Sequence, residues 1–152
     1  MDLKSEVKNV MLSSLKKSSD IKIGIEIENI IYNDKNERLM VNLCKDFSAT
    51  ELLKILNNDK NISENYSLEP GGQLEWASAP YKNLNDLEDS IIAQRKLLKE
   101  VLEKKQLKVV PYGLDPNFSP VDIELIDQKR YIFMNKNMEK SGSMGQWMMR
   151  CT

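Results

Sequence analysis

The sequence contains no histidine among its 152 residues. Histidine is the most frequent general base near neutral pH and a common zinc ligand. Its absence excludes Ser-His-Asp and Cys-His nucleophilic catalysis, and histidine-based zinc sites, within this segment. Any chemistry that these residues carry must therefore depend on carboxylates, arginine, lysine, backbone amides and bound metal ions.

The sequence also has little net charge, few cysteines and no long apolar run. The net charge of −1 gives no electrostatic reason to expect nucleic acid or a membrane surface as a partner. No apolar run approaches the roughly 20 residues of a transmembrane helix, and the N-terminus lacks a secretory apolar region. Cys44 and Cys151 do not have the spacing of metal ligands, so we expect reduced thiols in a cytoplasmic protein.

The pattern of apolar residues predicts a mixed α+β fold. Hydrophobic residues make up 41% of the chain, and its length suits a single domain over residues 1–152. Alternating or short apolar runs predict strands near residues 21–30, 38–43, 73–77 and 107–112. Helical spacing predicts helices near residues 2–17, 49–56, 85–105 and 128–138, of which we expect the first and third to pack on the core. Capping boxes begin the second and third helices, at Ser48 and Asn85.

The predicted strand Ile21–Ile30 places two acidic side chains on one face. Its isoleucines alternate with polar residues and glycine, so we expect the isoleucine face to be buried. Glu26 and Glu28 then share the opposite face, about 6.6–6.8 Å apart at about 3.3–3.4 Å per residue. Gly24 on the same face leaves room above the backbone.

The stretch Tyr66–Pro80 is the most sharply punctuated part of the chain. Pro70 and Gly71 suit the central positions of a type II turn, because proline presets the first φ and glycine tolerates a positive second φ. Beyond the turn, Gln73 and Glu75 share one face of a short strand whose other face is apolar. The turn glycines would let a ligand approach the backbone closely. A hairpin with solvated glutamates is the alternative interpretation.

The two stretches together predict a cluster of carboxylates. If their strands are neighbours in an antiparallel sheet, four acidic side chains come together: Glu26, Glu28, Glu69 and Glu75. So many carboxylates repel one another unless a cation neutralises them, and oxygen ligands suit Mg²⁺ or Mn²⁺. A metal site and a solvated acidic face both remain open on the spacing alone.

Four segments of the chain occur in the same order in a known family: GIEIE, SLEPGGQLEWASAP, KRYIFMNKNM and SMGQWMMRCT. On these segments the chain resembles the plant-type glutamate–cysteine ligases, a branch of the glutamine-synthetase-like carboxylate–amine ligases. The most specific piece is LEPGGQLE with the SAP that follows it. The chain departs from the family at Ile27, where a histidine is usual, and at Leu74, where phenylalanine is commoner. The resemblance begins near Lys22 and runs to the C-terminus.

The resemblance implies an antiparallel sheet of a glutamine-synthetase-like catalytic domain, flanked by helices and incomplete in this chain. Family members are considerably longer, so we expect residues 1–152 to be the N-terminal part of a longer ligase. The remainder of the ligase chain, C-terminal to Thr152, is then its structural partner, and the chain alone is expected to be an inactive fragment or a part of the active enzyme.

The activity that the resemblance implies is ATP-dependent synthesis of γ-glutamylcysteine, the first step of glutathione biosynthesis. ATP phosphorylates the γ-carboxylate of glutamate, and the amino group of cysteine attacks the acyl phosphate. The expected ligands are glutamate, cysteine, ATP and Mg²⁺, with Mn²⁺ as an alternative metal. Two other functions stay open from the residues: a related ligase with another amine acceptor, and a metal-dependent phosphohydrolase.

The resemblance also implies roles for individual residues. The metal ligands would be Glu26, Glu28, Glu69 and Glu75. The nucleotide or glutamate would lie near Glu69, Gly71, Gly72 and Gln73. Glu75 and Arg130 would be catalytic, and the planar fork of Arg130 would grip a substrate carboxylate through two parallel hydrogen bonds. The amino-acid site would be lined by Arg130, Tyr131, Met149 and Arg150.

Overall fold

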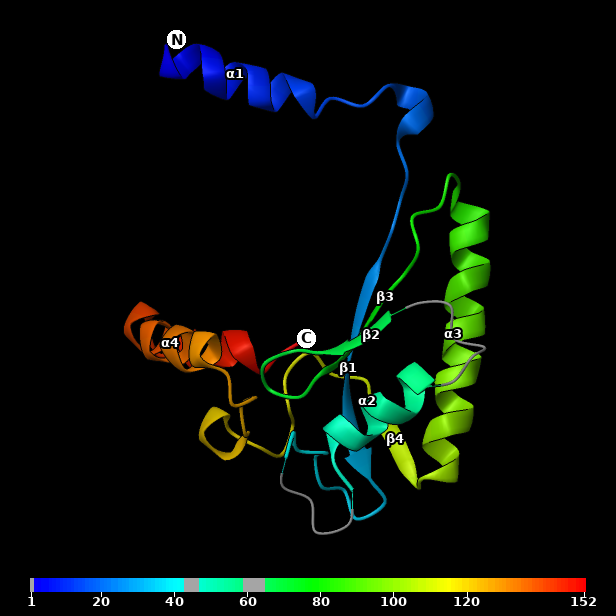
Figure 1. Cartoon of the computed structure of the whole chain (residues 1–152). Coiled ribbons are helices and arrows are strands. Elements are labelled where there is room, and N and C mark those ends of the chain that lie inside the picture. The colour runs from blue at the N-terminus through cyan, green and yellow to red at the C-terminus, as the bar shows by residue number, and fades with distance from the viewer. Residues whose placement is uncertain (1, 43–46, 59–64) are drawn as a thin grey trace.

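Figure 1 shows the computed structural model, in which helices flank one antiparallel sheet. The structure describes residues 2–42, 47–58 and 65–152, and the structural statements below concern these residues. The strands are β1 (Glu26–Asn33), β2 (Asn65–Leu68), β3 (Leu74–Ala77) and β4 (Leu107–Val110), and their order in the sheet is β2-β3-β1-β4. Every neighbouring pair is antiparallel. The predicted mixed fold with an antiparallel sheet is confirmed.

The helices lie close to the positions that the sequence predicts. They are α1 (Leu3–Ser13), α2 (Ala49–Asn58), α3 (Leu84–Lys104) and α4 (Lys129–Met138). Short 3₁₀ turns occupy Ser18–Asp20, Pro120–Asp122, Glu139–Ser141 and Gly145–Met149. Within the described residues, no helix combines the length and the apolar character needed to cross a membrane.

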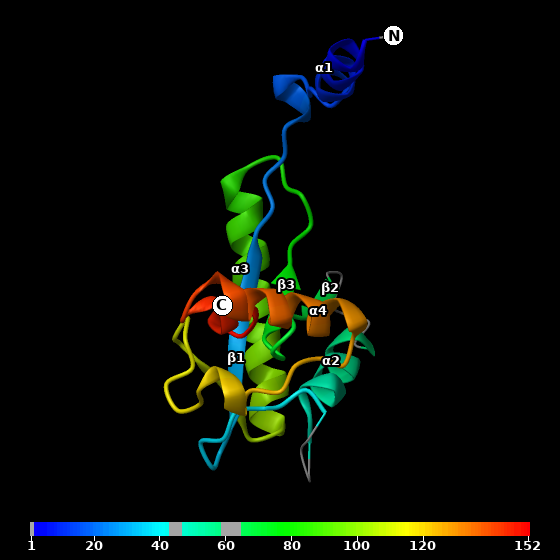
Figure 2. The same cartoon turned by 90° about the vertical axis from the view of Figure 1, so that its left-hand side faces the viewer.

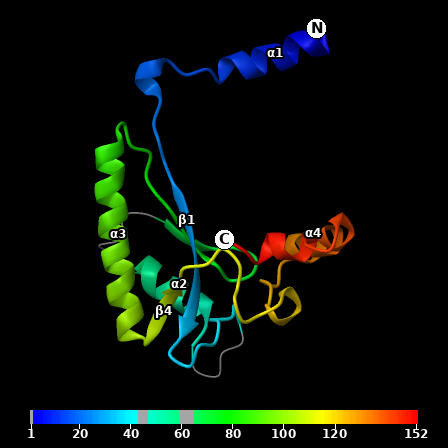
Figure 3. The same cartoon turned by 180° about the vertical axis from the view of Figure 1, so that it is seen from behind.

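The core lies between the sheet and the two helices α2 and α3 (Figures 1 and 3). Trp76 and Leu74 of β3 are each only 1% exposed, and they belong to the same cluster as Ile31 of β1, Leu56 of α2 and Leu98 of α3. Burying an apolar side chain of this size contributes about 1.5–3 kcal/mol. Because successive strand residues point to opposite faces, this packing leaves the acidic residues of β1 and β3 on the other face of the sheet.

The C-terminal part of the chain lies on the other side of the sheet from α3 (Figures 1 and 2). The ring of Tyr32, in β1, meets the ring of Phe118 edge-on, with 6.2 Å between their centroids. The amide of Thr152 donates to the carbonyl of Gly113 at 2.9 Å. Residues 111–152 therefore pack on the acidic side of the sheet at the end that holds Tyr32.

The predicted helix caps are partly confirmed. At the start of α2, the Ser48 amide donates to the Glu51 carboxylate at 2.8 Å, and the Glu51 amide donates back to the Ser48 hydroxyl at 3.3 Å. The cap predicted at Asn85 is wrong. The N-cap of α3 is Asn83, two residues before the predicted one, and its side chain accepts from the Asp86 amide at 2.9 Å. Asparagine is a favourable N-cap at either position, and residue type alone does not distinguish the two.

The strand predicted over residues 38–43 is wrong in its described part. Arg38 forms only an isolated bridge with Tyr32, although the next amide, that of Leu39, donates to the Ile31 carbonyl at 2.8 Å. The chain leaves the sheet here, and the Arg38 side chain forms a buried ion pair with Asp115. The end of this prediction, with Cys44, lies outside the described residues.

Helix α1 projects away from the rest of the chain in all three views (Figures 1 to 3). None of its residues is buried, and Leu3, Val10 and Met11 are 68–73% exposed. The prediction that this helix packs on the core is therefore wrong for this chain. The amphipathic pattern correctly predicts a helix, but it carries no information about the surface that the apolar face would meet.

The glycine turn between β2 and β3 differs from the predicted type II turn. The Gly72 amide donates to the Glu69 carbonyl at 2.8 Å, so Pro70 and Gly71 hold the central positions as predicted. The positive φ, +80°, falls on Gly72 instead of Gly71. The Glu69 amide donates to the Gln73 carbonyl at 2.9 Å, and this closes a three-residue hairpin loop that ends in a left-handed glycine.

We expect Gly72→Ala to destabilise the protein by about 1–2 kcal/mol, because a Cβ disfavours positive φ. The new Cβ would also lie 2.9 Å from Val41 Cγ2, so that side chain must shift. The matched control is Gly24→Ala, whose Cβ would have its nearest neighbour at 3.5 Å and no positive φ. Urea denaturation of both variants measures the difference, and equal stability of the two would contradict the argument.

Candidate active site

The sheet register brings the predicted glutamates of two strands face to face. Glu28 of β1 lies directly opposite Glu75 of β3, and Glu26 lies opposite Ala77. On the other side of β3, Ser67 of β2 pairs with Glu75, and its hydroxyl donates to Glu75 Oε1 at 2.8 Å. The condition for a carboxylate cluster, that the two acidic stretches are neighbours in an antiparallel sheet, is therefore met.

Glu69 joins this cluster from the start of the glycine turn. Burial is the main reason that the pKa of Glu69 lies above its ordinary value, and repulsion from Glu75 and Glu28 raises it further. A hydrogen bond with the Glu75 side chain acts in the same direction, while the positive charge of Arg130 lowers the pKa of Glu69. Burial first, then the charges of Glu75 and Glu26, also raise the pKa of Glu28.

The raised pKa values have a consequence for stability. A carboxyl whose pKa is higher in the folded state favours folding most below its unfolded pKa, which is 4.5 here, and loses this contribution as the pH rises through the folded pKa. Glu28→Gln is therefore expected to be slightly more stable than the unchanged chain at neutral pH without divalent cations. The gain should stay below about 1 kcal/mol, because solvent screens half-buried charges.

Thermal denaturation between pH 4 and pH 7 measures this effect. We expect the gain of Glu28→Gln to disappear at the acid end, where both the folded and the unfolded chain hold the proton. Glu100→Gln, on the exposed surface of α3, is the matched control and should show no gain. A gain of Glu28→Gln that is equal at both pH values would refute repulsion within the cluster as its cause.

The cluster suits a divalent cation in ligand type and in charge. Its donors are all carboxylates, which Mg²⁺ and Mn²⁺ prefer. A cation would relieve the repulsion that, after burial, raises the pKa values of Glu28 and Glu69. As the side chains stand, no three carboxylate or thiol groups of the described residues converge closely enough to hold one ion. Binding would therefore require the glutamate side chains to rotate toward one another.

The other turn residues are buried against the chain itself. Gln73 is 2% exposed, and its Nε2 donates to the Cys151 carbonyl at 2.7 Å, while its Oε1 has no partner among the described residues. A Cβ on Gly71 would lie 2.9 Å from the Met149 carbonyl oxygen. The close approach that Gly71 permits is thus made by the C-terminal segment, and the predicted contact of Gly71, Gly72 and Gln73 with a nucleotide stays a prediction.

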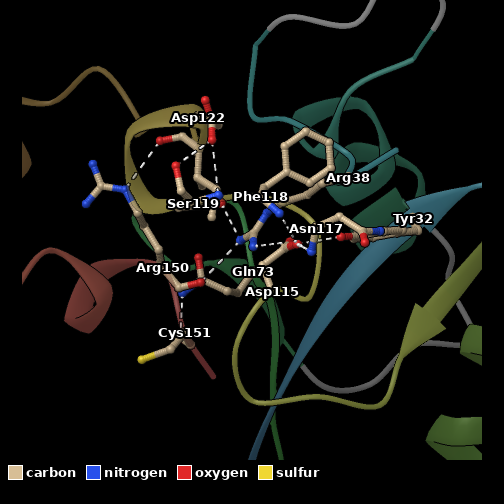
Figure 4. Close-up of polar contacts among 12 residues, drawn as sticks. Tyr32, Arg38, Gln73, Asp115, Asn117, Phe118, Ser119, Asp122, Arg150 and Cys151 are labelled. Carbon is tan, nitrogen blue, oxygen red and sulfur yellow. Dashed lines mark hydrogen bonds and ion pairs between the residues drawn. The ribbon is translucent and has the colours of Figure 1, made fainter. Parts of the chain in front are cut away.

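A buried polar group behind the turn is absent from the sequence-based predictions. Arg38 Nη1 and Asp115 Oδ2 form an ion pair at 2.9 Å, with their side chains 1% and 0% exposed. The Tyr32 hydroxyl donates to Asp115 Oδ1 at 2.5 Å, and Arg38 Nη2 donates to the Gly71 carbonyl at 2.9 Å (Figure 4). Burial alone would raise the pKa of Asp115, but the hydrogen bonds from Tyr32, Asn117, Arg38 and Phe118 outweigh it and hold that pKa below its ordinary value.

The predicted substrate residues divide into two sets. Arg130 is exposed at the start of α4, and its Cζ lies 4.4 Å from the centroid of the Tyr131 ring. Its positive charge lowers the pKa of Glu69. Tyr131 and Met149 are only 7% and 2% exposed. The Arg150 guanidinium makes hydrogen bonds within the chain: Nη1 donates to Asn135 Oδ1 at 2.9 Å and to the Gln146 carbonyl at 2.8 Å.

The geometry thus joins Glu26, Glu28, Glu69 and Glu75 with Arg130 beside them, while Met149 and Arg150 pack behind the glycine turn. Sequence spacing finds the glutamates because strands alternate. It misses Arg38 and Asp115, because their contact joins residues 77 positions apart. In the sequence, Arg38 and Asp115 are one arginine and one aspartate in two separate turn-rich segments, and nothing local indicates that they pair.

Comparisons with known proteins were made on the whole chain. The family model described as glutamate-cysteine ligase family 2 matches residues 22–152. A protein of Brassica juncea named glutamate–cysteine ligase, chloroplastic, is 29% identical over 135 residues, which are 84% of this chain and 26% of that protein. The protein of the same name from Medicago truncatula is 32% identical over 101 residues, 63% of this chain and 20% of the relative.

A rice relative gives the same result. Glutamate–cysteine ligase A, chloroplastic, of Oryza sativa subsp. japonica is 28% identical over 132 residues, which are 84% of this chain and 27% of that protein. The chain therefore spans between a fifth and about a quarter of the length of the curated relatives that it matches.

Proposed function

The chain belongs to glutamate-cysteine ligase family 2, and we propose that it forms the first part of a catalytic domain that joins the γ-carboxylate of glutamate to the amino group of cysteine. The observation that carries this proposal is the set of three glutamates, Glu28, Glu69 and Glu75, on neighbouring strands and the adjoining turn, with two of their pKa values raised. The family match supplies the reaction, and the acidic cluster supplies a place for it.

Mg²⁺ bound together with ATP would neutralise phosphate oxygens and lower the barrier to phosphoryl transfer. In the proposal, Glu28, Glu69 and Glu75 hold the metal ions, and Glu26 supports them from the exposed end of the strand. Ser67 orients Glu75 through its hydrogen bond and keeps one carboxylate oxygen in a fixed place. The cysteine amine would then attack the phosphorylated γ-carboxyl of glutamate, forming the amide bond and releasing inorganic phosphate.

Arg130 is the proposed ligand of the substrate carboxylate. It lies close enough to Glu69 to lower the pKa of that residue, and the Tyr131 ring supports its guanidinium plane. The Tyr131 hydroxyl accepts a hydrogen bond from Arg130 Nη2 at 2.7 Å, so the side chain is held in position before substrate binds. An anchored arginine loses less conformational freedom when it grips a carboxylate.

The remaining proposals concern the rest of the protein. We propose a glutamine-synthetase-like sheet that the polypeptide following Thr152 extends, with Gly71, Gly72 and Gln73 shaping the wall near the nucleotide. Met149 would act from its buried position in the same wall. A place in glutathione biosynthesis follows from the family name. The cytoplasm stays the predicted location, and the names of the plant relatives place those proteins in the chloroplast.

Mg²⁺-dependent release of ADP tests the proposed reaction. Because the chain covers only part of its relatives' length, the assay uses the uninterrupted reading frame that contains these residues, with glutamate and cysteine added singly and together. Release that requires both amino acids supports the ligase, and release without amino acids would replace it with a phosphohydrolase. Release with another amine but not with cysteine would assign a related ligase. The comparisons favour neither alternative, since the relatives reported above are all named glutamate–cysteine ligases.

A further inference from the structure

We propose that Arg38 is a positioning residue that fixes the glycine turn, with its glutamates, against the C-terminal segment and α4. Its guanidinium contacts three segments that are far apart in the sequence (Figure 4). Arg38 Nη1 donates to Asp115 Oδ2 at 2.9 Å, and Nη2 donates to the carbonyls of Gly71 at 2.9 Å and Arg150 at 3.5 Å. This inference rests on the proposed function, because the groups that it positions are those of the ligase site.

The surroundings of Arg38 hold its guanidinium in one orientation. Asp115 is itself fixed by the Tyr32 hydroxyl and by the amides of Asn117 and Phe118, at 3.0 and 2.9 Å. A carboxylate with this many donors cannot rotate freely, so the planar fork that binds it is fixed as well. The remaining nitrogen of the fork then points at the turn and the C-terminal segment together. Lysine offers one nitrogen in place of this fork and cannot make the same set of contacts.

One arm of the arrangement leads from Arg38 to the acidic cluster. Gly71 is two residues from Glu69, and the Gly72 and Glu69 backbones are joined by the hydrogen bond that closes the turn. The Pro70 carbonyl also accepts from the Ile126 amide at 2.8 Å. Moving the Gly71 carbonyl would therefore move the Glu69 carboxyl relative to Glu28 on the neighbouring strand.

The other arm leads from Arg38 to the proposed substrate arginine. The Arg150 backbone accepts from Arg38, and the Arg150 side chain is bonded to Asn135 on α4. Arg130 lies on the same helix, and its charge reaches Glu69. The two series of contacts thus lead from Arg38 to Glu69 and to Arg130. Arg38 therefore sets the separation between the metal-binding carboxylates and the arginine that binds the substrate carboxylate.

A second contact keeps the two segments attached when Arg38 is changed. Gln73 Nε2 donates to the Cys151 carbonyl at 2.7 Å, next to the Arg38 contacts and independent of them. Arg38→Lys keeps a positive charge near Asp115 and loses the fork, so we expect a folded protein with a displaced turn. A misplacement of about 1 Å can cost about 100-fold in rate. We expect kcat/KM for ligation to fall about 100-fold, with a raised KM for glutamate.

The kinetic experiment separates positioning from a purely structural role. If Arg38 only stabilised the fold, Arg38→Lys would lower the amount of active enzyme and hence the apparent kcat, while the KM for glutamate stayed unchanged. The matched control is Lys99→Gln, which breaks the exposed Lys99–Glu103 pair of 3.7 Å and should change neither constant. An unchanged KM for glutamate in Arg38→Lys would overturn the proposal. Should that variant fail to fold, the double variant Arg38→Gln with Asp115→Asn, which removes both charges of the buried ion pair, takes its place with the same expected result.

Hydrogen exchange gives a readout that does not depend on activity. In Arg38→Lys we expect the amides of Gly72 and Ile126 to exchange at least about tenfold faster, while amides in the centre of α3 are unchanged. Equal exchange in both proteins would overturn the proposal. If the unchanged protein released no ADP with both amino acids, the proposed function would fail, and the exchange measurement would still decide whether Arg38 holds the turn.

Discussion

Glu75→Gln is expected to abolish Mg²⁺-dependent ADP release in the presence of glutamate and cysteine. Glu75 is the central member of the acidic cluster. It lies opposite Glu28 of β1 on one side and opposite Ser67 of β2 on the other, and its charge raises the pKa of Glu69. Bound metal supplies several kcal/mol of charge stabilisation, and each 1.36 kcal/mol is a factor of ten in rate. We therefore expect kcat to fall at least about 1,000-fold, together with weaker binding of Mg²⁺.

The loss in Glu75→Gln should not come from unfolding. Removing one charge from the cluster relieves the repulsion that raises the pKa values of Glu28 and Glu69, so the variant should melt no lower than the unchanged protein at neutral pH. Glutamine also keeps an acceptor for the Ser67 hydroxyl. The matched control is Glu103→Gln on α3, which is exposed and should retain full activity. A variant at position 75 that is folded and active would remove the glutamate cluster from the mechanism.

The parts of the fold that depend on local patterns could be predicted from the sequence. Alternation placed Glu26 and Glu28 on one face of β1, because successive strand residues point to opposite faces. The predicted burial of the isoleucine face is wrong for the first half of the stretch: β1 begins only at Glu26, and Ile21, Ile23 and Ile25 are 37–59% exposed. The Ser48 capping box gave the start of α2 for a similarly local reason. The predicted type II turn was wrong, because both adjacent glycines tolerate a positive φ. The hydrogen bonds that close the hairpin place the positive φ on Gly72. The prediction that α1 packs on the core was wrong, because the periodicity of apolar residues does not identify the surface that they contact.

The candidate site could be predicted only where its residues lie on strands. Glu28 and Glu75 meet because two strands pair, and the sequence pattern of each strand already placed its glutamate on the polar face. The role of Arg150 at the substrate stays a prediction; in this structure its side chain donates to Asn135 Oδ1 and to the carbonyls of Gln146 and Ile123. Burial lowers the pKa of Arg150, and nothing in a short sequence window shows that an arginine will be buried.

The buried ion pair is expected to be the polar interaction with the largest effect on stability. Arg38→Gln removes the positive charge from beside Asp115, whose side chain is fully buried. Removing one partner of a buried pair leaves an uncompensated charge and costs about 3–5 kcal/mol. We expect a loss of about 3 kcal/mol at neutral pH, at the low end because Tyr32 and two amides still bind the carboxylate. Urea denaturation of both proteins measures it.

The pH dependence of that loss identifies its cause. In the unchanged protein the pKa of Asp115 is below its unfolded value of 3.8, so its contribution is present above that pH and is lost as the pH falls through the folded pKa. Without Arg38 the pKa of Asp115 must rise, since burial then acts with one opposing group fewer. The difference in stability between Arg38→Gln and the unchanged protein should therefore shrink as the pH falls from 7 toward 4.

The double variant Arg38→Gln with Asp115→Asn is the control for this argument. It lacks both charges of the buried pair, and the asparagine carbonyl can still accept from Tyr32, so replacing both partners should cost less than replacing Arg38 alone. The difference in stability between the double variant and the unchanged protein should stay constant from pH 7 to pH 4, because the pKa of Asp115 in the unchanged protein lies below that range. A double variant that is as unstable as the single one would show that the fork's hydrogen bonds to the Gly71 and Arg150 carbonyls, and not the charge of Asp115, stabilise this part of the fold.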